Sequence, residues 1–152
     1  MSSTTRRLLL PLLVGGVLLW NGALAAAPYA LSQRAGGGAL VGATIVYVAG
    51  SFLCHQRADR SFHPWGVKLP VCGRCAGLYA GALLGLLGVI RCVRVRATRG
   101  LLAAAAFPTA ATLVLEVSGV LDPGNPGRAA AAVPLGAAVC WFVAGAIRGK
   151  VH

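Results

Sequence analysis

Residues 54–79 of this 152-residue chain read CHQRADRSFHPWGVKLPVCGRCAGLY. This stretch contains three of the five cysteines, two of the three histidines and several charged side chains. Long apolar runs lie on both sides of it. Because polar and metal-capable groups are costly to keep at the edge of a bilayer, this motif is the first candidate for a functional site.

The composition outside the motif is that of a membrane protein. Hydrophobic residues make up 57% of the chain and charged residues only 11%, whereas a soluble domain carries about 25% charged residues. Mean hydropathy is +0.76. The net charge of +11 would suggest nucleic acid in a soluble protein. Here the cations lie between apolar runs, so we expect membrane lipid as the partner and no nucleic acid.

Five apolar runs predict an all-α, polytopic helix bundle of about five spans, formed by residues 1–152 as a single transmembrane domain. The runs are Leu8–Ala27, Gly38–Leu53, Ala76–Ile90, Leu101–Leu121 and Ala129–Ile147. A crossing needs about 20 residues, so the second and third runs are expected to extend into the motif loop that joins them.

The first run has a second interpretation. Arg6-Arg7, the leucine-rich core and Ala23-Leu24-Ala25 also resemble a cleavable signal peptide. The apolar stretch is long for such a signal, and we favour an uncleaved span.

The parity of five spans places residues 54–75 and 122–128 on one side of the membrane and residues 91–100 on the other. All three acidic residues, Asp59, Glu116 and Asp122, then fall in or near the first side. The opposite loop has only cations, Arg91, Arg94, Arg96 and Arg99. We therefore expect one polar site, on the mixed side. The orientation stays open, because Arg6 and Arg7 favour a cytoplasmic motif and the four loop arginines favour the reverse.

The thiols and imidazoles of the motif suggest a metal site. Cys72-Gly-Arg-Cys75 is a C-x-x-C pair, which can bind one soft metal ion or close a disulfide. Cys54 and His55 add two ligands, and a tetrahedral zinc site needs four nitrogen or sulfur ligands. Side chains adjacent in sequence usually diverge, so His55 is alternatively a supporting group or a base, with His63 as a substitute ligand.

Four interpretations of the cluster stay open at this point: a structural metal site, a thiol redox site with Cys54 as the resolving partner, an open metal position for catalysis or transport, and a plain thiol cluster. Whether the protein is an enzyme is therefore undecided. Cys92 and Cys140 are interpreted as small buried thiols. Cys92 would lie across the bilayer from Cys75, since a helix rises about 1.5 Å per residue.

The basic residues of the motif suggest a third function. Arg57, Arg60, Lys68 and Arg74 would favour thiolates, but they would equally bind phosphate or lipid headgroups. A lipid or phosphate carrier is the corresponding alternative. Glu116, in an otherwise apolar run, needs a partner such as Arg128 or a motif arginine.

Small residues predict how the third run packs. Glycines recur along one helical face at Gly77, Gly81, Gly85 and Gly88. This small-xxx-small pattern allows a neighbouring helix to approach closely.

The motif resembles an uncharacterised family of small predicted integral membrane proteins, domain of unknown function 2085. The residues that carry the resemblance are Cys54, His55, Gln56, Arg57, Arg60, Ser61, Phe62, Leu69, Pro70, Val71, Cys72, Arg74, Cys75, Gly77 and Tyr79. Tyr47, Glu116, Asn125 and Arg128 fit the family's pattern more loosely. The resemblance implies a multi-span membrane protein and no assigned activity.

The sequence therefore predicts an integral protein of a prokaryotic cytoplasmic membrane with a metal site, zinc or another soft divalent ion. The expected ligands are Cys54, His55, Cys72 and Cys75. The expected surrounding pocket consists of Gln56, Arg57, Arg60, Ser61, Arg74, Tyr79, Glu116, Asn125 and Arg128.

Overall fold

The computed structural model describes residues 3–90 and 99–148, and this part of the chain is helical with no strand. Its five α-helices are α1 (Ser3–Ser32), α2 (Gly37–Leu53), α3 (Gly73–Ile90), α4 (Arg99–Val117) and α5 (Gly124–Arg148). The predicted all-α bundle is confirmed. Cys92 and the loop cations Arg91, Arg94 and Arg96 lie outside the described residues.

Four of these helices, α1, α3, α4 and α5, are long and apolar enough to cross a membrane. Helix α2 is apolar but has only 17 residues. It does not extend into the motif as we expected, because Cys54 adopts extended backbone angles (φ −151°, ψ 137°) and ends the helix. Helix α3 does extend into the motif, and its first turn includes Arg74 and Cys75.

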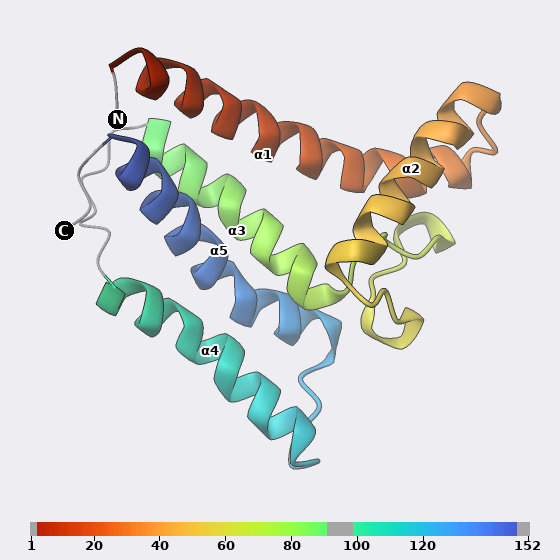
Figure 1. Ribbon diagram of the computed structural model, residues 1–152. Coiled ribbons are helices and arrows are strands. Elements are labelled where there is room, and N and C mark those ends of the chain that lie inside the picture. Colours follow the sequence, from red (N-terminus) through yellow and green to blue (C-terminus); the bar gives the residue numbers. More distant parts are fainter. Residues whose placement is uncertain (1–2, 91–98, 149–152) are drawn as a thin grey trace.

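Helices α3 and α5 run parallel and side by side at the centre of the molecule (Figure 1). The glycine face of α3 lies directly on α5: Gly77 abuts the backbone of Ala129 and Gly81 that of Val133. From the other side, Gly136 abuts the backbone of Leu78. Since lipid tails are as apolar as the helices, such close backbone contact supplies much of the packing energy in a bilayer. The predicted packing face is confirmed.

Helix α4 packs on α5 and ends earlier than the apolar run predicts. Gly119 has a positive φ of 70°, and the N–H groups of Gly119 and Val120 donate to the carbonyls of Glu116 and Leu115. These two bonds form a Schellman cap. The predicted boundary at Leu121 is therefore wrong, and Glu116 lies in the last turn of the helix.

Helix α5 begins earlier than its apolar run. The Asp122 side chain accepts a hydrogen bond from the Gly124 N–H (2.8 Å), and Asn125 is already helical. The connection between α4 and α5 thus consists of residues 118–123. Arg128 consequently lies in the second turn of α5 and donates to Glu116 at the end of α4.

Helices α1 and α2 pack against each other and cover the loop end of α3. Leu24 and Trp20 of α1 join an apolar cluster that includes Cys54, Val71 and Cys72. Both ends of the motif loop are therefore packed against protein, which irregular backbone would need at membrane depth.

Candidate functional site

The two ends of the motif loop are joined through sulfur. Cys54 is the first residue after α2, and its Sγ accepts a hydrogen bond from the backbone N–H of Cys72 (3.2 Å). Cys72 immediately precedes α3. This contact brings the end of α2 and the start of α3 together, although 18 residues separate them in sequence.

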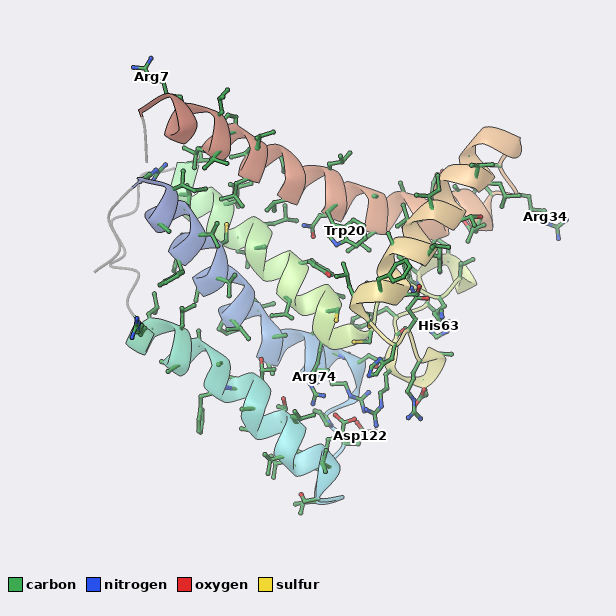
Figure 2. All side chains as sticks on the ribbon, in the orientation of Figure 1. Arg7, Trp20, Arg34, His63, Arg74 and Asp122 are labelled. Atoms are coloured by element: carbon green, nitrogen blue, oxygen red, sulfur yellow. The ribbon has the colours of Figure 1, made fainter. Side chains whose placement is uncertain are left out.

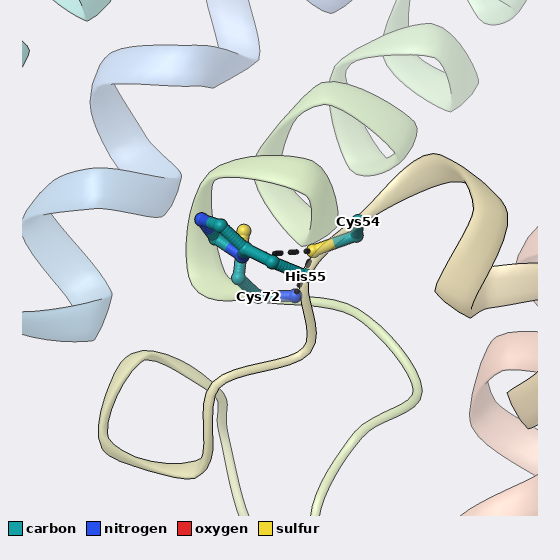
Figure 3. Close-up of side chains that lie close together, drawn as sticks. All are labelled: Cys54, His55 and Cys72. Atoms are coloured by element: carbon teal, nitrogen blue, oxygen red, sulfur yellow. Dashed lines mark hydrogen bonds between the residues drawn. The ribbon is translucent and has the colours of Figure 1, made fainter.

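Three potential metal ligands converge at this junction (Figure 3). The ligand atoms of Cys54, His55 and Cys72 all lie within 4.8 Å of one another. His55 Nδ1 is 3.9 Å from Cys54 Sγ. We expected these adjacent side chains to diverge, but they lie close together. Zinc–ligand bonds of about 2.0–2.3 Å would bring such atoms only slightly closer. Both cysteines are buried, whereas His55 is exposed.

Cys75 lies beside this group but not fully within it. It does not belong to the set of ligand atoms within 4.8 Å of one another. It does contact Cys72, and this hydrogen bond, above all other causes, lowers the pKa of Cys72 from the ordinary value of 9.0 to about 5. Thiols of Cys-X-X-Cys motifs and thiols at helix N-termini commonly have a lowered pKa. Cys72 is thus poised to act as a thiolate.

His63, the proposed substitute ligand, is exposed and lies in the middle of the loop (Figure 2). It is not part of the Cys54–His55–Cys72 group.

A strained turn follows the metal-capable group. Gln56 has a positive φ of 45°, and its Nε2 donates to the Tyr47 carbonyl (2.7 Å). Lys68 Nζ donates to the Gln56 carbonyl (2.8 Å), and the Tyr47 hydroxyl donates to the Lys68 carbonyl. Gly50 permits this arrangement, since a Cβ there would lie 2.5 Å from the Pro70 carbonyl oxygen. Strained backbone of this kind persists where the surroundings over-determine it.

Three arginines converge on one carboxylate at the same end of the bundle. Glu116 of α4 pairs with Arg60 of the loop (3.1 Å), Arg74 of α3 (2.8 Å) and Arg128 of α5 (2.9 Å). The Glu116 side chain is 8% exposed. Glu116 therefore has three arginine partners, and the cluster joins four separate elements: the loop, α3, α4 and α5.

The two polar loops meet, as the parity of the spans predicts. Asn125 Nδ2 donates to the Ser61 carbonyl (2.9 Å), and Asn125 Oδ1 accepts from Arg128 (3.1 Å). Ser61 is fully buried and donates to the Arg57 carbonyl. Asp122 accepts from Arg128 (2.8 Å). Figure 2 shows Arg74 and Asp122 at the same end of the molecule.

One cavity of about 330 Å³ connects the sulfur group to the arginines. We call it the arginine–sulfur cavity. It is lined by Leu53, Cys54, His55, Arg60, Cys72, Arg74, Cys75, Leu78, Thr109 and Arg128. A neighbouring hollow of about 310 Å³ shares Arg60 and Arg128 and includes the acids Asp59, Glu116 and Asp122. Thiol, imidazole and guanidinium groups thus share one solvent space.

Not every predicted pocket residue lines this cavity. Arg57 is exposed and pairs with Asp59 (3.2 Å), which lowers the pKa of the Asp59 carboxyl. Tyr79 packs edge-on against Trp20, with ring centroids 5.9 Å apart, on the side of α3 that faces α1. Gln56, Ser61 and Asn125 brace the loop from outside the cavity.

Three lining residues were not predicted from the sequence. Thr109 is a polar residue in an apolar helix and could have been suspected on that ground; its hydroxyl donates to the Ala131 carbonyl. Leu53 and Leu78 carry no such signal, because apolar residues are ordinary in membrane helices.

Comparison with known proteins agrees with this architecture. A family profile described as "Predicted membrane protein (DUF2085)" matches residues 54–142, which contain the motif and helices α3 and α4. An uncharacterised protein of Methanocaldococcus jannaschii is 45% identical over 42 residues, covering 28% of this chain and 27% of the relative. The chain thus matches about a quarter of that relative's length. No solved structure matches. Since the profile covers more than half of the chain, this protein belongs to the DUF2085 family of predicted membrane proteins.

Proposed function

We propose that the protein binds a soft divalent metal ion, zinc in the first instance, through Cys54, His55 and Cys72. The observation that carries the proposal is the convergence of two sulfurs and an imidazole nitrogen within 4.8 Å. Sulfur and nitrogen donors at this spacing suit tetrahedral zinc. The acidity of Cys72 favours the proposal further, since a metal ligand has to be a thiolate.

Cys75 is the proposed fourth ligand. It lies in the first turn of α3 and already contacts Cys72, which is one of the three converging ligands. A bound ion would then hold the end of α2, the start of α3 and the first residues of the loop together. This role would be structural, as in closed zinc sites with four protein ligands.

Elemental analysis of the detergent-purified protein tests this proposal. We expect about one equivalent of metal per chain in the wild type and almost none in the Cys72→Ser/Cys75→Ser variant. Cys140→Ser is the matched control, because Cys140 is a buried thiol of α5 outside the cavity. A reduced wild type that contains no metal and takes up neither zinc nor cobalt would contradict the proposal.

The same contact between Cys72 and Cys75 favours one alternative, a membrane thiol oxidoreductase. In that case Cys72 and Cys75 would form a disulfide, and two electrons and two protons would pass to a disulfide acceptor, which would leave as a dithiol. Cys75→Ser should then trap a mixed disulfide through Cys72. If no mixed disulfide forms under oxidising conditions, this alternative is excluded.

We also propose that the protein lies in the cytoplasmic membrane of a prokaryote as a single transmembrane domain, with lipid and not nucleic acid as its surroundings. The similarity to an archaeal protein and the four apolar helices support this location. Fractionation of the native host's membranes tests it, since recovery of the protein in the soluble fraction would contradict it.

A further inference from the structure

Arginines outnumber the acidic residues around the arginine–sulfur cavity. Arg60, Arg74 and Arg128 line it, and one buried carboxylate, Glu116, pairs with all three. Asp122 adds a second negative charge on Arg128, but its side chain is 71% exposed. The third and last acidic residue of the chain, Asp59, pairs with Arg57 (3.2 Å) and more distantly with Arg60 (3.9 Å). The four arginines, Arg57 included, therefore outnumber the three acidic residues by one.

Glu116 cannot satisfy the remaining donors. Its Oε2 already accepts from Arg74 (2.8 Å) and from Arg128 Nε (3.2 Å), and its Oε1 accepts from Arg60 and Arg128 Nη2. A carboxylate has about four acceptor positions, while each guanidinium has five N–H donors. The acceptor capacity of the carboxylate is thus used up while donors of Arg60 and Arg74 are left over.

One of these donors is a buried group without a partner. Among the described residues, Arg74 Nε is inaccessible to solvent and makes no hydrogen bond. A buried donor without a hydrogen-bond partner is costly, and such a group can mark the position of an ion or ligand. Arg74 lines the cavity, so an acceptor placed there could relieve this cost.

The bundle adds positive potential at the same end. Helices α3 and α5 begin at Gly73 and Gly124, beside the cluster, and run parallel (Figure 1). The N-terminus of a helix has a partial positive charge and favours anions. Two such ends reinforce the three guanidinium groups.

We propose that the arginine–sulfur cavity binds a phosphate group, either as a free phosphate compound or as the headgroup of an anionic phospholipid. Guanidinium groups recognise phosphate through paired, charge-assisted hydrogen bonds. The volume of about 330 Å³ lies at the small end of the range for ligand pockets. Leu53 and Leu78 on its wall would contact the less polar part of a phosphoester.

This phosphate site does not depend on the proposed metal. A divalent ion held by three thiolates and a neutral imidazole carries a net charge of −1, so it supplies no positive charge to a phosphate group. The site rests instead on the unused donors of Arg60 and Arg74. The Cys72→Ser/Cys75→Ser variant separates the two proposals, since it loses the metal ligands and retains all three arginines.

The test uses the full chain in detergent, with inorganic phosphate as the probe, followed by calorimetry or by ³¹P line broadening. A second arm reconstitutes the protein in nanodiscs of phosphatidylcholine with or without phosphatidylglycerol and measures bound lipid by native mass spectrometry. The variant is Arg60→Gln, because the Arg60 side chain is 33% exposed and lies on the loop, so the bundle should survive its replacement. Arg57→Gln is the matched control, on the same loop but outside the cavity.

We expect Arg60→Gln to weaken phosphate or phosphatidylglycerol binding about tenfold, Arg57→Gln to leave it unchanged, and both variants to retain metal. Saturation by inorganic phosphate would identify a soluble ligand; selective retention of phosphatidylglycerol alone would identify a lipid headgroup. Two results overturn the proposal: no saturable binding of either probe, or equal weakening by Arg57→Gln and Arg60→Gln. A wild-type protein that contains no metal but still binds phosphate would refute the metal site and leave the phosphate site standing.

Discussion

A single methyl group added to the glycine face of α3 tests the close packing of α3 on α5, which holds the residues of the site together. In Gly81→Ala, the new Cβ would lie 2.2 Å from the Val133 carbonyl oxygen, whereas ordinary contacts begin near 3.4 Å. The atoms that it meets belong to the backbone of α5, so no side chain can rotate away. The two helices would have to separate by roughly 1.2 Å, the shortfall between those two distances.

The expected cost follows from this rigidity. Inserting a group into a close-packed contact costs typically about 1–3 kcal/mol, and a backbone obstacle favours the upper end. The matched control is Gly42→Ala in α2, where a Cβ would meet nothing within 4 Å. There the better helix propensity of alanine should stabilise the protein by about 0.5–1 kcal/mol. The same substitution is therefore expected to have opposite signs at the two positions.

The assay is reversible unfolding in mixed micelles by titration with sodium dodecyl sulfate, followed by circular dichroism, with metal content as a second readout. Gly81→Ala should unfold at a lower detergent fraction than the wild type, and Gly42→Ala at an equal or higher one. Equal stability of Gly81→Ala and the wild type would refute the close approach of α3 and α5 on which the site is built.

Three further predictions concern the site. Because the pKa of Cys72 is lowered from 9.0 to about 5, its thiolate stabilises the metal-free fold fully above pH 9 and loses this effect as the pH falls through 5. The thiolate ultraviolet absorbance should therefore titrate near pH 5, and Cys75→Ala, which removes the main hydrogen bond, should move the midpoint upward. Glu116→Gln should lower the unfolding temperature well below that of Asp59→Asn, since it leaves three guanidinium groups facing a neutral amide; equal melting temperatures would contradict the central position of this carboxylate. Gly50→Ala should cost about 1–3 kcal/mol and reduce metal uptake, because its Cβ would press on the loop backbone at 2.5 Å; retained metal with unchanged stability would argue against the braced turn.

Much of the architecture could be predicted from hydropathy. The five apolar runs correspond to the five helices, because a bilayer demands long apolar segments with internally satisfied backbones. The glycines of α3 identified its packing face, because only residues without bulky side chains permit backbone contact. The parity of the spans predicted that residues near Ser61 and Asn125 would meet, and a hydrogen bond joins them.

Element boundaries depended on contacts that the sequence pattern does not express. Helix α2 stops at Leu53 because Cys54 turns to receive the Cys72 N–H. Helix α4 stops before its apolar run ends because Gly119 caps it. Hydropathy reflects neither of these contacts. Leu121, which lies beyond the end of α4, is as apolar as Leu115, which lies within it.

The sequence by itself determined that thiols, an imidazole and arginines would gather in one polar stretch of a membrane helix bundle. Only the tertiary structure decided which of them face one another: His55 turns toward Cys54, Cys75 stays at the margin, and three arginines from different elements share Glu116. The physical reason is that hydropathy follows from side-chain chemistry one residue at a time. Convergence depends on the parallel pairing of α3 and α5, which places their two N-termini beside the loop and the end of α4.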